Sequence, residues 1–475
     1  MTAKQYSPML TDFYQLTMAY GYYQLGMHEQ QANFHLIFRK NPFKGHYALC
    51  CGLGTVIDYL SDWRFEASDL DYLASLKTLH AKPLFNKSFL DYLQNLRFTC
   101  NVDAIPEGTI VFPNEPLLRI QGPILQCQLI ETALLNMVNF QTLIATKASR
   151  VCQAAQGDPV IEFGMRRAQG PDGAVIASRA AYIGGCIATS NTLAGKLYHI
   201  PVRGTHAHSW VTAFPSELEA FQAYADIMPH HCNLLVDTYN SLEGVKNAIL
   251  VGNKLREVGE DLLGIRLDSG DMANLSIKAR KLLDDAGFTK TVIMASNSLD
   301  EYAITRLKEQ GAKISAWGVG TNLATAYDHP ALDGVYKLSA LADKSGKWQN
   351  KLKLSEQEVK ISNPGRHQVR RFFYEDRYLA DVIYDLDLGI SDTPTGILID
   401  HSKNIKLNDY DGYVDLLKPI IENGKLISPQ EPISEIRQHA MAAVKDFIAQ
   451  EQKENMVLLE EGLYEVKREL IGKLK

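Results

Sequence analysis

One repeating pattern in the middle of the chain restricts its fold more than any other feature. Short apolar runs end in Gly, Asp or Ser and are followed by helical stretches, such as the one that places Met272, Leu275 and Ala279 at helical spacing. From Leu234 onward the runs recur at roughly 25–30 residues, the length of a strand with its crossover helix. This alternation predicts parallel strands. The runs are 160–163, 202, 233–236, 263–267, 291–295, 314–317 and 335–338.

The number of these units favours one architecture. About seven strand–helix units in one stretch are typical of an irregular TIM-like (β/α) barrel. A doubly wound open sheet is the alternative, because closure of a sheet cannot be counted from a sequence. The chain of 475 residues is long enough for several domains. We expect an N-terminal α+β domain over 1–135, the barrel over 136–343, and a C-terminal extension of strands and helices over 344–475 that packs with the N-terminal domain.

The flanking segments carry their own signals. We expect a first helix from Met9 to Gly26 with Thr11 as its N-cap, and a strand over Asn33–Arg39. Ser298 to Glu301 has the spacing of a capping box, and Ser269 or Asp271 is placed as the N-cap of the helix that follows it, over 271–286. The other expected elements are helical residues 54–96 and 124–153, strands over 98–102, 109–112 and 117–120, and two last helices over 434–450 and 456–474.

Composition excludes several classes of protein. The net charge of −6 argues against a general nucleic-acid binder, which usually carries a basic excess. No apolar run reaches membrane-spanning length, and the first residues lack the apolar core of a signal peptide. The seven cysteines lie between Cys50 and Cys232 without a C-x-x-C pair, which indicates reduced thiols in a cytoplasmic protein.

Polar residues follow the predicted barrel strands, where each strand ends. They are Arg166 and Arg167, Asp237, Arg266 and Asp268, Ser296, and the segment Gly318-Val-Gly-Thr321. Because parallel strands present their carboxyl ends at one rim of a barrel, we expect these residues to form a single site. Taken singly, each has a structural alternative. The two arginines could form salt bridges between helices, and the aspartates could cap helices.

Two motifs indicate the chemistry of this rim. The glycines of Gly318-Val-Gly-Thr321 allow a backbone to approach an anion, and their late position matches that of phosphate sites in barrels. The segment is not a Walker loop. Arginines and carboxylates beside it suit a diphosphorylated sugar with Mg²⁺. In Gly204-Thr-His-Ala-His208, a histidine could act as a base, a metal ligand or a phosphoryl acceptor.

At these residues the chain resembles the nicotinate phosphoribosyltransferase family. The matching segments are 10–20, 38–43, 162–173, 204–210, 235–239, 265–271 and 317–321. The match is weaker after about Leu341, and the cysteine-rich C-terminal metal motif of some members is missing. The resemblance implies a type II phosphoribosyltransferase fold in a homodimer, with the active site near the subunit interface. It implies transfer of phosphoribose from 5-phosphoribosyl 1-pyrophosphate to nicotinate, coupled to ATP hydrolysis through a phosphohistidine, with Mg²⁺ as cofactor.

The resemblance also implies roles for single residues. His208 matches the phosphorylated histidine, whereas His206 falls at a variable position of that motif. The residues implied to contact nicotinate are Tyr14, Thr205 and Arg266. Those implied to contact phosphoribosyl pyrophosphate are Arg39, Arg166, Arg167, Asp237, Asp268, Gly318, Gly320 and Thr321. Individual ligands of Mg²⁺ are not assigned.

Two other functions compete with this one. The first is that of the nicotinamide-using relative, which carries an aspartate after the Gly-Thr where this chain has His206. The second is a non-catalytic nucleotide sensor on the same scaffold, since a fold alone does not determine function. Arg266, His208 and Thr321 are all present, which argues against the sensor.

Overall fold

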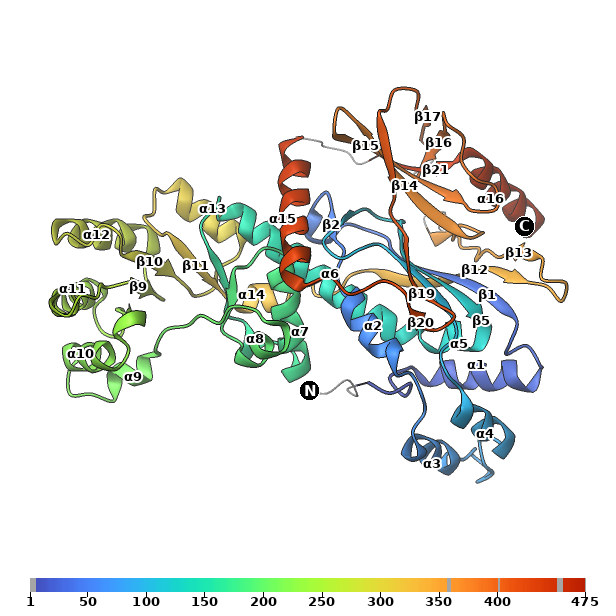
Figure 1. Cartoon of the computed structure of the whole chain (residues 1–475), viewed down its shortest axis with the longest axis horizontal. Coiled ribbons are helices and arrows are strands. Elements are labelled where there is room, and N and C mark those ends of the chain that lie inside the picture. The colour runs from blue at the N-terminus through green and yellow to red at the C-terminus, as the bar shows by residue number, and fades with distance from the viewer. Residues whose placement is uncertain (1–5, 357–359, 400–401, 451–455, 475) are drawn as a thin grey trace. The chain divides into compact units, whose positions relative to one another are not determined.

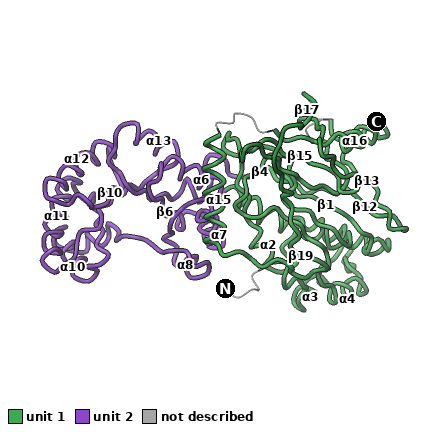
Figure 2. The backbone as a smooth tube through the Cα atoms, turned by 45° about the horizontal axis from the view of Figure 1, so that its top comes forward, with its two compact units in different colours: residues 1–143, 331–475 green, residues 144–330 purple. Residues whose placement is uncertain are grey.

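The computed structural model describes residues 6–356, 360–399, 402–450 and 456–474. The chain forms two compact units (Figure 2). Unit 1 consists of residues 1–143 and 331–475, and unit 2 consists of residues 144–330. The N-terminal and C-terminal portions of the chain therefore share one unit, while most of the predicted barrel forms the other.

Unit 2 is built on six parallel strands: β6 (Val160–Glu162), β7 (Ala188–Thr189), β8 (Asn233–Leu235), β9 (Gly264–Leu267), β10 (Val292–Ala295) and β11 (Ala316–Val319). Their order in the sheet is β7-β6-β11-β10-β9-β8. The last strand, β11, pairs with the first, β6, so the sheet curls back on itself as in a barrel. The predicted barrel-like fold is confirmed over the doubly wound alternative.

The barrel strands alternate with helices that cover the sheet. In Figure 1, α10 (Glu217–Ile227), α11 (Ser241–Glu257) and α12 (Met272–Asp285) stack side by side beyond β9 and β10. The remaining helices of unit 2 are α7 (Gly170–Ile183), α8 (Thr192–Tyr198), α9 (His208–Thr212), α13 (Glu301–Glu309) and α14 (Thr321–Ala324), with short 3-10 turns at Met165–Arg167 and Pro229–His231. A further helix, α6 (Glu131–Ala154), runs from unit 1 into unit 2.

The ring of strands has one interruption. Val202 forms a single parallel bridge with Thr189 and so extends the β7 side of the sheet. Within the described residues, no ladder joins Val202 to β8, the strand at the other end of the sheet. The barrel is therefore open along this line.

Three details of the barrel differ from the sequence predictions. Residues 335–338 lie in β12 (Gly334–Ala342), which pairs antiparallel with β1 in unit 1, because cross-strand pairing and not spacing decides which sheet an apolar run joins. Strand β7 was missed, since two residues carry no periodic signal. The helix α13 begins after Asp300, whose carboxylate accepts from the Ala303 amide, so Ser298 is not its cap. Of the two predicted caps of α12, Ser269 and Asp271, the structure shows Asp271 in that role.

Unit 1 contains two larger sheets. One has the order β13-β12-β1-β5-β3-β19-β20 and the other β17-β16-β21-β15-β14-β18, while β2 and β4 form a separate pair. Its remaining strands are β1 (Gln31–Phe38), β2 (Ala48–Leu49), β3 (Asn101–Ala104), β4 (Ile110–Val111), β5 (Pro116–Pro123), β13 (Trp348–Asn350), β14 (His367–Tyr374), β15 (Arg377–Asp385), β16 (Thr395–Leu398), β17 (Asn404–Lys406), β18 (Gly412–Asp415), β19 (Lys418–Glu422), β20 (Lys425–Leu426) and β21 (Val457–Glu460).

The helices of unit 1 are α1 (Phe13–Gln24), α2 (Leu53–Ser61), α3 (Ala67–Ser75), α4 (Lys87–Asn95), α5 (Ile124–Leu129), α15 (Ile433–Ala449) and α16 (Glu461–Leu474), with a 3-10 turn at Pro42–Lys44. The prediction that Thr11 caps α1 was wrong. The hydroxyl of Thr11 donates to the Leu129 carbonyl, and the helix begins after Asp12. The last predicted helix starts instead as strand β21, which pairs with β15.

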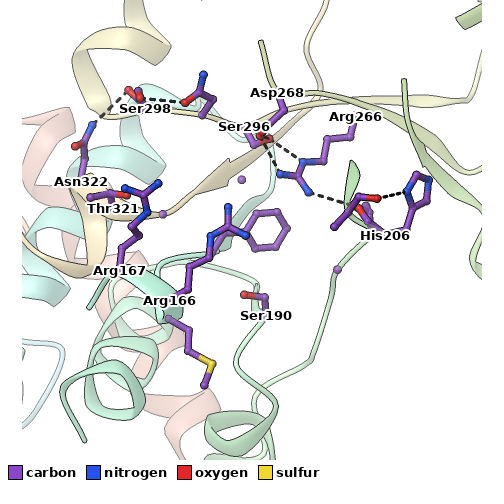
Figure 3. A pocket seen from close by; sticks show the side chains of 18 residues that line it. Arg166, Arg167, Ser190, His206, Arg266, Asp268, Ser296, Ser298, Thr321 and Asn322 are labelled. Carbon is purple, nitrogen blue, oxygen red and sulfur yellow. Dashed lines mark hydrogen bonds and ion pairs between the residues drawn. The ribbon is translucent and has the colours of Figure 1, made fainter. Parts of the chain in front are cut away.

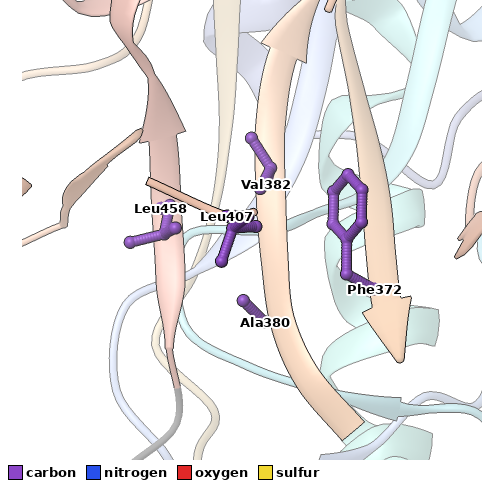
Figure 4. Packing of buried hydrophobic residues seen from close by; sticks show 5 residues of the cluster. All are labelled: Phe372, Ala380, Val382, Leu407 and Leu458. Carbon is purple, nitrogen blue, oxygen red and sulfur yellow. The ribbon is translucent and has the colours of Figure 1, made fainter. Parts of the chain in front are cut away.

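Apolar side chains from three strands and a loop hold the second sheet of unit 1 together. Phe372, Ala380, Val382, Leu407 and Leu458 form a buried cluster (Figure 4). Burial of such side chains is the main favourable contribution to folding. No helix among the described residues has both the length and the apolar character required to cross a membrane. All seven cysteines are free thiols, in agreement with the prediction.

Candidate active site

A pocket of about 540 Å³ opens where the barrel strands end. It is lined by the ends of β9 and β11, by the segments that follow β6, β7, β9, β10 and β11, and by residues 204–207. Eight of the predicted site residues line it: Arg166, Arg167, Thr205, Arg266, Asp268, Gly318, Gly320 and Thr321. Figure 3 shows Arg166 and Arg167 extending from one side and Arg266 from the other toward the same space. The expectation that these segments meet at one rim is confirmed.

Arg266, on β9, is fixed by three side chains. Its Nε donates to Ser296 Oγ at 2.8 Å and its Nη1 to Thr205 Oγ1 at 3.1 Å. Its Nη2 donates to Asp268 Oδ1 at 2.9 Å. The side chain is only 14% exposed, so the guanidinium is held rigidly. The remaining N–H donors of the fork are left for an anionic ligand.

Asp268 is the acidic partner of this arginine. Burial raises the pKa of its carboxyl group, but the hydrogen bond from Ser296 and the charge of Arg266 outweigh that effect and bring the pKa below its ordinary value. The carboxylate is therefore ionised at neutral pH. Ser296 bridges the pair, because its hydroxyl also donates to Asp268 Oδ1. Sequence reasoning noted Ser296 at a strand end but gave it no role.

The loop after β6 carries two exposed arginines. Within the described part of the chain, neither Arg166 nor Arg167 has an ion-pair partner, so the alternative of structural salt bridges is not supported. The buried side chain of Glu162 holds this loop in place. Its carboxylate accepts from the Gly164 amide, from Ser178 Oγ at 2.8 Å and from Thr189 Oγ1 at 2.6 Å. Sequence reasoning did not single out this glutamate.

The glycine segment Gly318–Thr321, at the end of β11, packs directly against the same loop. A Cβ atom on Gly318 would lie 2.7 Å from the ring of Phe163, and one on Gly164 would lie 2.3 Å from the Cβ of Ala324. Both positions therefore require glycine for close approach of the two loops. The helix that follows, α14, is a single turn beginning at Thr321.

His208 begins α9 and is half-exposed at the rim. Its Nδ1 lies 3.1 Å from Thr238 Oγ1, and its Nε2 lies 3.9 Å from Asp268 Oδ2. The side chain is 44% exposed, which leaves the ring accessible. Thr238 was not predicted as a site residue, because a threonine after a strand carries no distinctive signal.

Asp237 lies behind the rim and supports it. Its Oδ2 accepts from the Asp268 amide at 3.0 Å and from Ser269 Oγ at 2.6 Å. Its Oδ1 is buried, and within the described residues it has no hydrogen-bond partner. One carboxylate oxygen beside the site is thus unsatisfied.

Two predicted site residues lie in unit 1. Tyr14 is on α1 and is 50% exposed. Burial and the charge of Glu131 raise the pKa of its hydroxyl, so the phenol is neutral at pH 7. Arg39 follows β1, and its Nη1 lies 3.8 Å from Asp333 Oδ1. Their contacts with a ligand remain a prediction.

The described residues contain no group of three or more His, Cys, Asp or Glu side chains arranged to hold a metal ion. Mg²⁺, however, commonly takes only one or two carboxylates and completes its coordination with water and substrate phosphate oxygens. The unsatisfied oxygen of Asp237 and the ionised carboxylate of Asp268 fit that donor chemistry.

The arrangement defines a class of protein. A parallel barrel with guanidinium groups, an ionised carboxylate and a glycine segment around one rim pocket is typical of (β/α)-barrel enzymes that act on anionic substrates.

Comparison with known proteins identifies the family. Residues 9–139 match the nicotinate phosphoribosyltransferase (NAPRTase) N-terminal domain, and residues 159–359 match the nicotinate phosphoribosyltransferase (NAPRTase) family. A nicotinate phosphoribosyltransferase of Bacillus subtilis is 46% identical over 377 residues, which cover 79% of this chain and 75% of the relative. The chain belongs to the nicotinate phosphoribosyltransferase family.

Solved structures agree with this assignment. The crystal structure of human nicotinic acid phosphoribosyltransferase aligns with a TM-score of 0.85 and 30% identity, covering 97% of this chain and 99% of that one. The nicotinate-nucleotide pyrophosphorylase from Pyrococcus furiosus, at 23% identity and a TM-score of 0.69, shares the fold.

Proposed function

We propose that the chain joins nicotinate to 5-phosphoribosyl 1-pyrophosphate, giving nicotinate mononucleotide and pyrophosphate. The observation that carries the proposal is Arg266, whose guanidinium is anchored by three side chains and keeps donors directed at the pocket. A planar guanidinium matches a carboxylate bidentately, which favours nicotinate over the uncharged nicotinamide. The names of the relatives support the same activity.

The reaction requires one bond to form as another breaks. The pyridine nitrogen of nicotinate attacks the anomeric carbon, and the bonding electrons between that carbon and oxygen leave with pyrophosphate. Negative charge grows on the leaving group, and Arg166 and Arg167, which have no ion-pair partner among the described residues, are available to stabilise it. The Gly318–Thr321 segment would hold the ribose phosphate by its backbone, as phosphate loops of barrels do.

Asp237 and Asp268 would hold Mg²⁺ together with the pyrophosphate oxygens. When bound, the ion would neutralise charge on the leaving group. The carboxylate of Asp268 has a second task in this chain, because it also orients Arg266 at 2.9 Å.

We further propose that His208 couples the reaction to ATP. In that step a ring nitrogen attacks the γ-phosphorus, the bond to ADP breaks, and water later releases phosphate from the phosphohistidine. Thr238 Oγ1 occupies the Nδ1 side of the ring at 3.1 Å, so Nε2 is the nitrogen left for attack when Nδ1 carries the proton.

We also propose a cytoplasmic homodimer whose active site takes residues from the partner. Tyr14 and Arg39 belong to a different unit from the rim pocket, and Tyr14 lies exposed beside the exposed apolar side chains of Phe13 and Met18. Symmetric dimers are the commonest soluble assemblies. Light scattering at the assay concentration tests this, and an active monomer would contradict it.

Release of pyrophosphate by the purified chain with nicotinate or nicotinamide tests the proposed activity. We expect turnover with nicotinate, Mg²⁺ and phosphoribosyl pyrophosphate, stimulated by ATP. Preference for nicotinamide would assign the chain to the alternative substrate. Tight nucleotide binding without turnover of either base would indicate a sensor.

A further inference from the structure

His206 lies at the interruption of the barrel. The ring of strands is open between Val202 and β8, where the described residues form no ladder. On the closed side of β8, the Val236 amide donates to the Arg266 carbonyl of β9. Since successive amides of a strand point to opposite edges, the Leu235 amide faces the open side. Leu235 is buried, so this amide needs a protein partner.

The side chain of His206 supplies that partner. The Leu235 amide donates to His206 Nε2 at 3.2 Å, which places an imidazole where a neighbouring strand would offer a carbonyl. The ring is 8% exposed and lies edge-on to Tyr224 of α10, with ring centroids 4.9 Å apart. Its Nδ1 lies 3.3 Å from the Ala207 carbonyl.

These contacts select one form of the histidine. Nε2 must carry a lone pair to accept from an amide, so the proton lies on Nδ1 and points to the Ala207 carbonyl. Burial lowers the pKa of His206, and the charges of Arg266 and His208 act in the same direction, which favours the neutral ring.

The anchored segment carries two residues of the active site. Thr205 precedes His206 and accepts from Arg266 Nη1 at 3.1 Å, and His208 follows two residues later. We propose that His206 is a positioning residue: its side chain replaces the missing strand pairing at the open edge of the barrel and thereby holds Thr205 and His208 at the rim. The effect on turnover rests on the proposed function, whereas the effect on the barrel edge does not.

Two substitutions separate the acceptor from the rest of the side chain. His206→Leu introduces an apolar side chain of similar size and removes the acceptor. His206→Gln can offer its amide oxygen to the Leu235 amide without an imidazole. His231→Leu, at an exposed histidine of the same unit, is the matched control. Each full-length variant is compared with the wild type by hydrogen exchange at the Leu235 amide and by kcat and KM for nicotinate.

We expect His206→Leu to lose exchange protection at Leu235 and to lower kcat/KM by about 10- to 100-fold, since displacements of about 1 Å have such effects. We expect His206→Gln to restore both toward wild type, and the control to change neither.

Unchanged protection and activity in His206→Leu would overturn the proposal. So would a His206→Gln variant that keeps Leu235 protected but loses activity, because His206 would then act on the substrate directly. If the leucine variant does not fold, the glutamine variant still decides between these results. If the wild type shows no transfer, the proposed function fails while the exchange comparison still tests the edge.

Discussion

Replacement of Arg266 by alanine should weaken nicotinate binding far more than binding of phosphoribosyl pyrophosphate. The guanidinium is the cation anchored on β9 at the pocket, whereas Arg166 and Arg167 on a separate loop remain for the phosphates. The variant removes the partner of the substrate carboxylate. It also leaves Asp268 with the Ser296 hydroxyl but without its counter-ion.

The magnitude follows from the kind of bond that is lost. A hydrogen bond to a charged group contributes about 1.5–3 kcal/mol to affinity. Since about 1.4 kcal/mol corresponds to a factor of ten, KM for nicotinate should rise by about 10- to 150-fold. KM for phosphoribosyl pyrophosphate should rise by a smaller factor, because the substitution reaches that substrate only through Asp268, which loses its counter-ion.

Steady-state kinetics with each substrate varied at saturation of the other measures both effects. Arg266→Lys serves as the charge-retaining control, because lysine keeps the charge but loses the planar fork, and it should fall between wild type and alanine. Thermal unfolding of each variant checks that the fold persists. Equal losses for the two substrates in a folded variant would refute the assignment of Arg266 to nicotinate.

Three further predictions address other parts of the molecule. His208→Ala should abolish ATP hydrolysis and acid-labile labelling by γ-labelled ATP while some ATP-independent transfer survives, and labelling that persists in this variant but disappears in His206→Ala would reverse the assignment. Gly318→Ala places a Cβ 2.7 Å from the Phe163 ring, so we expect a loss of about 1–3 kcal/mol in unfolding free energy by urea titration together with reduced kcat, and unaltered values would contradict the packing. Burial lowers the pKa of His367 in unit 1 to about 4, below the ordinary value of 6.5. Its contribution to stability should therefore be complete above about pH 6.5 and should decline by about 1.4 kcal/mol per pH unit as the pH falls from 6.5 toward the folded-state pKa of about 4. Urea titrations of His367→Gln should show a flatter pH dependence than those of the wild type.

Much of the catalytic unit was predictable because its signals are local. Strand–helix spacing indicates a parallel barrel, and polar residues at strand ends indicate a rim. Ser269 or Asp271 was predicted to cap α12 from its position before the helix, and the structure shows that Asp271 does so. Such features depend on a few neighbouring residues and the geometry of one element.

Other features depended on partners far away in the chain. Residues 335–338 have the apolar character of a barrel strand but pair with β1 of unit 1, about three hundred positions earlier, because a strand joins the sheet whose register buries its side chains. Glu162 resembles any other acidic residue until Ser178 and Thr189 are brought to its carboxylate. A buried, fully hydrogen-bonded carboxylate has no sequence signature.

The two histidines of the Gly204–His208 segment show most clearly which properties follow from the sequence and which depend on the tertiary structure. The sequence by itself determined the membership of the family, the barrel, and the set of charged residues at its rim, because motif order and strand spacing are written along the chain. It could distinguish His206 from His208 only by motif position. The tertiary structure decided what each ring contacts: His206 accepts from the Leu235 amide, while His208 faces Thr238 and Asp268. Hydrogen-bond partners are set by which strands lie side by side, and that is a property of the folded barrel.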